Sequence, residues 1–177
     1  VILGCMNRGG LSGTVFEMDD RMTAFTSERI KEIRLDGAKI MLRLETTERE
    51  SGATISYCSG VINELNRIGI PVFVETLPVK KEGKRYKTIK SADSLIQVIG
   101  VATGLGYSSM NTWLKIPYCE DFDKVAKATT CPILLLGGEA TGDPEVQASG
   151  RRHSTQVGHL EGLGEDSTNL RRGPPSP

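Results

Sequence analysis

The sequence has 177 residues with 22 basic and 22 acidic side chains, so its formal net charge is zero. This balance favours neither a nucleic acid nor an acidic membrane as a partner, and no apolar run approaches the roughly 20 residues of a membrane span. The length suits one domain but is shorter than the roughly 250 residues of a closed (β/α)8 barrel. We expect a cytoplasmic protein with buried free thiols, because the four cysteines lack C-x-x-C spacing.

The first apolar run predicts a strand that leads into a long loop. It extends from Val1 to Met6 and ends in the turn signal Asn7-Arg8-Gly9-Gly10. The sequence has no initiator Met, so we expect it to begin inside a longer chain. The loop continues to Phe25 and carries Asp19-Asp20-Arg21. Loops of this length are often functional, although a solvated charged turn fits the same residues.

Two further strands each carry a charged residue on one face. Gly37 to Leu44 has apolar residues at its even positions and Lys39 among its odd ones. Ile70 to Leu77 has the same character, with Glu75 on the face opposite its valines. The basic stretch from Lys80 to Lys87 predicts a solvated loop, although a ligand that bears phosphate would also favour its charge.

Helical patterns separate these strands. Thr26 predicts the N-cap of a helix that ends at Asp36-Gly37. Apolar residues from Tyr57 to Ile68 recur at helical spacing, and Gly69 closes that helix. Ser91 predicts the N-cap of another amphipathic helix.

A strand–helix–strand unit follows. Trp113 to Pro117 and Cys131 to Gly138 are short apolar runs typical of strands buried on both faces, and Glu120 to Thr130 has helical spacing. Within the first strand, Leu114 and Ile116 share one face. Lys115 points to the other, so it faces whatever the sheet encloses if the helices cover the apolar side.

The alternation from Val1 to Gly138 gives five strands and four helices. This pattern predicts an α/β fold with a parallel sheet, either an open doubly wound sheet or part of a (β/α)8 barrel. From Glu139 onward the pattern stops, and residues 139–177 contain no Phe, Trp or Tyr. We expect residues 1–138 to form an incomplete barrel domain and residues 139–177 to be a disordered or non-native tail.

Lys39, Glu75 and Lys115 fall on the same predicted face of three strands. A lone charge there would cost several kcal/mol unless it is paired or functional. One interpretation is a buried Lys–Glu–Lys network, or lysines that reach water at the end of the sheet. The other is catalytic, because a second ammonium and the loss of water favour the free amine of Lys115 as a nucleophile. Its Schiff base with a ketone would act as an electron sink, and Glu75 would move protons.

Several strand segments resemble a known enzyme family, the class I aldolases grouped with tagatose-bisphosphate aldolase and DhnA-type fructose-bisphosphate aldolase (the LacD/DhnA-like group). The segments are Gly37-Ala38-Lys39-Ile40-Met41-Leu42, Val74-Glu75-Thr76-Leu77, Trp113-Leu114-Lys115-Ile116-Pro117 and Leu134-Leu135-Leu136-Gly137-Gly138. They resemble strands four to seven of that family. The resemblance implies a partial (β/α)8 TIM barrel of approximately strands 3 to 7, without strands one, two and eight.

The resemblance also implies roles for individual residues. Lys115 corresponds to the lysine that forms the Schiff base, and Lys39 and Glu75 correspond to the lysine and glutamate of the tagatose-bisphosphate branch. The loop that begins with Asn7 and Arg8 resembles the strand-three loop of the group. We therefore expect a second, substrate-binding set, which consists of Asn7, Arg8, Arg43, Gly137 and Gly138. The last two would offer backbone N–H groups to a phosphate.

The resulting function is cleavage of a phosphorylated ketose by a class I aldolase, a carbon–carbon lyase of carbohydrate metabolism that needs no cofactor. The expected partner is a small phosphorylated sugar, and the open sheet edges also allow self-association. One alternative is a transaldolase-type Schiff-base enzyme. Another is a non-catalytic sugar-phosphate binding or regulatory protein on an aldolase scaffold. We expect no metal site, because the two histidines, His153 and His159, both lie in the tail.

Overall fold

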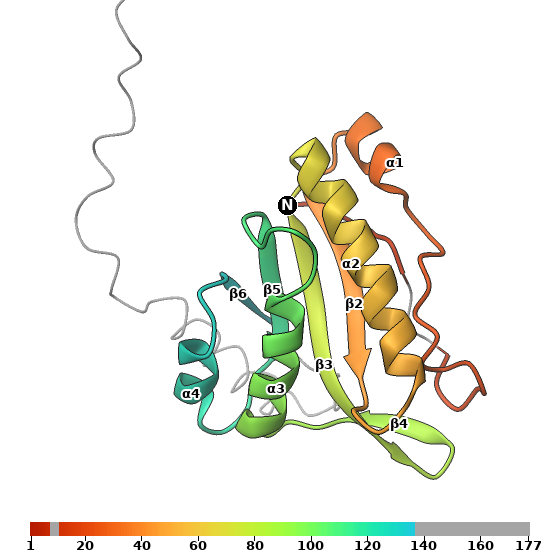
Figure 1. Ribbon diagram of the computed structural model, residues 1–177, viewed down its shortest axis with the longest axis vertical. Helices are drawn as coiled ribbons and strands as arrows, with labels where there is room; N and C mark the ends of the chain where they lie inside the picture. The colour runs from red at the N-terminus through yellow and green to blue at the C-terminus, as the bar shows by residue number, and fades with distance from the viewer. Residues whose placement is uncertain (8–10, 137–177) are drawn as a thin grey trace, which may run out of the picture. The chain divides into compact units, whose positions relative to one another are not determined.

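The computed structural model describes residues 1–7 and 11–136 (Figure 1). Residues 139–177 lie outside the described residues, so the predicted tail and the division at Gly138 stay predictions. Among the described residues, none of the helices has the length and apolar character needed to cross a membrane.

Five parallel strands of the described residues form one sheet in the order β1-β2-β3-β5-β6. Their bounds are Leu3–Cys5 for β1, Gly37–Leu44 for β2, Val72–Glu82 for β3, Thr112–Pro117 for β5 and Ile133–Leu136 for β6. The strand order follows the chain order without a reversal, which is the arrangement of a barrel segment and not of a doubly wound sheet. The sheet is thus a parallel half-barrel, an α/β fold that resembles a partial TIM barrel, as predicted.

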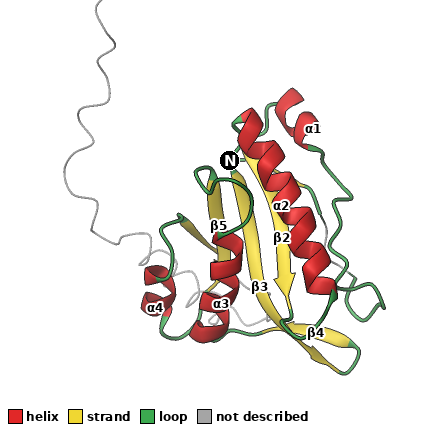
Figure 2. Cartoon of the chain, in the orientation of Figure 1, coloured by secondary structure: helices red, strands yellow, loops and turns green. Residues whose placement is uncertain are grey.

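In the part of the chain that the structure describes, four helices join the parallel strands. They are α1 (Ser27–Glu32), α2 (Glu50–Ile68), α3 (Ala92–Thr103) and α4 (Phe122–Lys127). Figure 2 shows α2 and α3 across the same face of the sheet. The predicted N-caps are confirmed, because the hydroxyl oxygens of Thr26 and Ser91 accept hydrogen bonds from the N–H groups of Arg29 and Ser94. Helix α1 ends earlier than predicted, before Arg34 adopts a φ of 57°.

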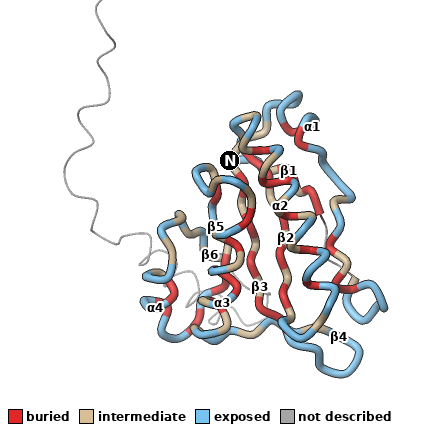
Figure 3. Tube along the Cα trace, in the orientation of Figure 1, coloured by how far each residue is buried: buried red, intermediate tan, exposed pale blue. Residues whose placement is uncertain are grey.

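The core lies between the sheet and these helices, and it follows the predicted alternation. Ile40 and Leu42 of β2, Val74 of β3, and Leu114 and Ile116 of β5 are completely buried. Their odd-numbered neighbours are less buried, which leaves the second face of the sheet for polar residues. Figure 3 shows this alternation as changes of colour along the strands.

One predicted element is wrong, the solvated loop from Lys80 to Lys87. Strand β3 continues to Glu82 and pairs antiparallel with β4 (Arg85–Thr88), so this stretch is a β-hairpin. Gly83, with φ at 63°, supplies the left-handed conformation that the tight turn requires. The charged side chains are exposed as expected, but the backbone groups beneath them pair with each other.

Candidate active site

The three charged residues predicted on neighbouring strands meet on one face of the sheet. Glu75 and Lys115 are register partners on β3 and β5, and Lys115 Nζ donates to Glu75 Oε2 at 3.0 Å. Lys39 of β2 is in register with Phe73, two residues before Glu75, and its Nζ lies 3.2 Å from the same oxygen. The predicted arrangement of Lys39, Glu75 and Lys115 is confirmed, whereas their catalytic roles stay predictions.

This cluster, which we call the ionic array, is partly shielded from water. The exposed fractions of the side chains are 17% for Lys39, 14% for Glu75 and 28% for Lys115. Two ammonium groups that share one carboxylate oxygen attract it and repel each other. The carboxylate lies within proton-transfer distance of both amines. The array therefore places an acid–base group next to two amines that are candidate nucleophiles.

Arg43, predicted to bind substrate, lies on the same face of β2, four residues beyond Lys39. Its guanidinium donates to both carboxylate oxygens of Asp20, from Nε at 2.9 Å and from Nη2 at 2.6 Å, and Nη2 also donates to the carbonyl of Glu17. Asp20 is buried, and burial raises the pKa of its carboxyl although the hydrogen-bonded Arg43 opposes this effect. The positive charge of Arg43 is thus already paired, and its contact with substrate stays a prediction.

Asn7 holds the start of the first loop against β2. Its side chain is completely buried. Nδ2 donates to the carbonyls of Asp20 at 3.1 Å and Met41 at 2.8 Å, and Oδ1 accepts from the N–H of Met41 at 2.6 Å. These bonds use both ends of the amide and give Asn7 a structural role, while substrate binding by Asn7 stays a prediction. Arg8, Gly137 and Gly138 lie outside the described residues.

Sequence reasoning missed Glu17 and named Asp20 only as part of a charged loop, whereas both acidic residues pair with Arg43. Glu17 and Asp20 come from the loop between β1 and α1, and both are buried. The carboxylate of Glu17 accepts hydrogen bonds from the N–H groups of Gly13 at 2.6 Å and Tyr86 at 3.2 Å, so it joins this loop to the hairpin of β3 and β4. The only signal in the sequence was the length and charge of the loop.

Metal ligands do not gather in this region. Within residues 1–7 and 11–136, no three His, Cys, Asp or Glu side chains are arranged to hold a metal ion. The four cysteines are free, as predicted, but only Cys58 and Cys119 are buried.

Comparisons with known proteins identify both a family and a fold. A family model described as Cgl0159-like matches residues 1–168. The crystal structure of Cgl0159 from Corynebacterium glutamicum is 32% identical, with a TM-score of 0.82 over 88% of this chain and 52% of that chain. No curated protein matches the sequence.

More distant structures share the fold. A Schiff-base-forming fructose-1,6-bisphosphate aldolase is 15% identical, with a TM-score of 0.61 over 79% of this chain and 54% of its own. An archaeal fructose-1,6-bisphosphate aldolase, whose catalytic lysine is covalently bound to the carbinolamine intermediate of its substrate, is 16% identical, with the same TM-score and the same shares covered. The chain thus spans about half the length of these proteins and has an aldolase-like fold.

Proposed function

We propose that this chain, which belongs to the Cgl0159-like family, is part of a class I aldolase that cleaves a phosphorylated ketose through a Schiff base on Lys115. The observation that carries the proposal is the contact of 3.0 Å between Lys115 Nζ and Glu75 Oε2, with Lys39 Nζ 3.2 Å from the same oxygen. The aldolase-like fold supports it.

The reaction begins at the amine of Lys115. The unprotonated Nζ attacks the ketone carbon, and the carbonyl oxygen takes up a proton to give a carbinolamine. Loss of water then leaves a protonated imine. When the bond between the third and fourth carbons breaks, its electron pair moves into the imine and gives an enamine. The aldehyde forms as the hydroxyl on the fourth carbon loses its proton.

Glu75 is the acid–base group in this scheme. As a carboxylate it takes the proton from the hydroxyl of the fourth carbon, and as a carboxylic acid it returns a proton to the enamine carbon. Water then hydrolyses the imine and releases the ketone product with the free amine of Lys115. Lys39 holds the carboxylate of Glu75 from the β2 side and balances its charge while Lys115 is uncharged.

Covalent trapping tests the proposal. The chain is incubated with dihydroxyacetone phosphate and borohydride, which reduces an imine to a stable amine, and is then digested for peptide mass spectrometry. We expect the reduced adduct on Lys115 and none on Lys127, an exposed lysine of α4. A folded chain without an adduct on Lys115 contradicts the proposal.

A second candidate is a non-catalytic protein that binds a sugar phosphate. It is favoured by the pairing of both lysines with Glu75, since such an ion-pair network can be purely structural, and its two ammonium groups against one carboxylate leave a positive charge that suits a phosphate. In that case dihydroxyacetone phosphate would raise the melting temperature of the chain without any covalent adduct. The trapping experiment and a melting curve on the same sample separate the two functions.

A further inference from the structure

An aromatic pair lies beside the ionic array, one step toward the amino ends of the strands. Phe73 and Trp113 are register partners, two residues before Glu75 and Lys115 on the same strands. Because side chains alternate along a strand, the two rings face the same side of the sheet as the ion pair. Their centroids are 5.4 Å apart and their planes differ by 29°, so the rings are stacked.

The neighbouring backbone leaves room for this stack. A Cβ atom at Gly37 would lie 3.2 Å from Cε2 of Phe73 and 2.9 Å from the carbonyl oxygen of Pro71, which is too close for any larger residue. On the β2 side, Lys39 is in register with Phe73, and its amine extends past this level to Glu75. Phe73 is therefore held between Lys39 and Trp113.

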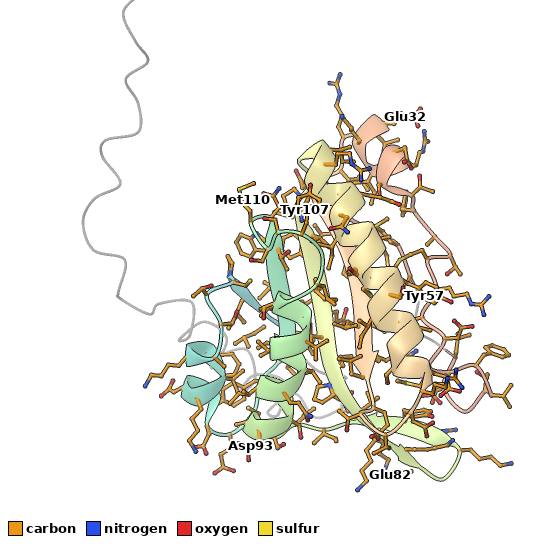
Figure 4. The ribbon with its side chains drawn as sticks, in the orientation of Figure 1. Glu32, Tyr57, Glu82, Asp93, Tyr107 and Met110 are labelled. Carbon is orange, nitrogen blue, oxygen red and sulfur yellow. The ribbon has the colours of Figure 1, made fainter. Side chains whose placement is uncertain are left out.

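Trp113 lies on the face of the sheet opposite the helices. Its exposed fraction is 39%, whereas Leu114, the next residue, points to the helices and is completely buried. The stack lies near the amino end of β5, which follows the loop that contains Tyr107 and Met110. Glu82, at the carboxyl end of β3, marks the opposite end of the sheet (Figure 4).

We infer that the Phe73–Trp113 stack is the floor of the reaction site and positions Lys115 and Glu75 for the step at the carbonyl carbon. This inference rests on the proposed function. Two rings fill the level below the ion pair, so a ketone reaches Lys115 Nζ from the carboxyl ends of the strands, where barrel enzymes bind substrate. Phe73 and Trp113 are positioning residues, because they make and break no bond.

The rate of borohydride trapping by dihydroxyacetone phosphate, measured per folded molecule, tests this role. Small displacements of reacting groups cost up to a hundredfold in rate, so Phe73→Leu and Trp113→Leu should slow adduct formation about tenfold to hundredfold. Trp113→Phe keeps a ring on Phe73 and should stay within about threefold of the parent chain. Phe122→Leu removes the other stack, in which Phe122 and Tyr118 have centroids 5.7 Å apart, and should not change the trapping rate.

A spectroscopic measurement on the unaltered chain avoids any effect of substitution on folding. Trp113 is the single tryptophan. Its emission should change when the adduct forms on Lys115, two residues away, and unchanged emission overturns the inference. Normal trapping rates in both leucine variants also overturn the inference. In that case the adduct on Lys115 of the parent chain still supports the proposed function. A parent chain without an adduct on Lys115 overturns the proposed function and this inference together.

Discussion

Lys39 and Lys115, which lie on strands separated by β3, share one carboxylate oxygen, Oε2 of Glu75, at 3.2 and 3.0 Å. Neither lysine has its own counterion in the array. Each contact therefore depends on the position of the other lysine. This sharing makes Glu75 the residue whose loss affects both amines.

Replacing Glu75 with glutamine should reduce both turnover and stability. Turnover should fall about a hundredfold to ten-thousandfold, because the amide cannot move protons. The free energy of unfolding should fall by about 1–3 kcal/mol, because two partly buried ammonium groups lose their counterion. Steady-state cleavage assays and urea denaturation measure the two effects.

Glu82→Gln is the matched control for that substitution. Glu82 pairs with Lys87 at 2.5 Å on the surface of the hairpin, with both side chains more than half exposed. Exposed ion pairs contribute little to stability, so this variant should behave like the parent chain. Equal losses in the two variants would mean that the array has no special role.

The two lysines should differ when each is replaced by methionine. Lys115→Met should abolish the borohydride adduct and the cleavage activity, because it removes the nucleophile. Lys39→Met should still form the adduct on Lys115, but more slowly, because Glu75 loses one of its two partners. Peptide mass spectrometry locates the adduct in each variant. If the adduct is lost in Lys39→Met and persists in Lys115→Met, Lys39 is the nucleophile and Lys115 is the supporting residue.

The sequence predicted this array because the pattern of each strand is regular. Leu42, Val74 and Leu114 fix the face that packs against the helices, so the parity of Lys39, Glu75 and Lys115 follows. No comparable period links Asp20 to Arg43, because Asp20 lies in an irregular loop and the contact spans 23 positions in the chain. The hairpin of β4 was missed for another reason, since its charged side chains resemble those of a solvated loop.

Asp20 should make the stability of the fold depend on pH. Burial raises the pKa of its carboxyl above the ordinary value of 3.8, so the folded state binds this proton more tightly than the unfolded state. The stabilising contribution is therefore present below pH 3.8 and is lost as the pH rises through the higher pKa of the folded state.

The comparison of the parent chain with Asp20→Asn isolates this effect. Urea denaturation of both proteins between about pH 3 and pH 7 gives the difference in the free energy of unfolding. The advantage of the parent chain over the variant should be greatest at the acidic end. An advantage that grows toward neutral pH would show that the ion pair with Arg43 outweighs burial.

Cys58 should resist alkylation in the folded chain. Its side chain is completely buried beneath β2, and burial raises the pKa of the thiol to about 12. At pH 8.5 the reactive thiolate is therefore nearly absent, while the half-buried Cys5 and Cys131 are accessible to iodoacetamide. Mass spectrometry should find Cys58 modified only in denaturant, and rapid native modification would contradict its burial.

Glu17 should stabilise the contact between the first loop and the β3–β4 hairpin. Its carboxylate is almost fully buried and accepts hydrogen bonds from the N–H groups of Gly13 and Tyr86. Tyr86 lies 69 positions after Glu17 in the chain. In Glu17→Gln the amide has one oxygen for these two donors, so the free energy of unfolding should fall by about 1–3 kcal/mol. The hairpin should also open more often, because its link to the loop is weakened.

Limited digestion with trypsin measures that opening. The hairpin presents Lys84 and Arg85 at its turn, and cleavage there requires the strands to separate locally. Cleavage should be faster in Glu17→Gln than in the parent chain and unchanged in Glu120→Gln, which alters an exposed carboxylate. If all three proteins are cut at the same rate, the hairpin is held by its own strand pairing, and Glu17 stabilises only the loop.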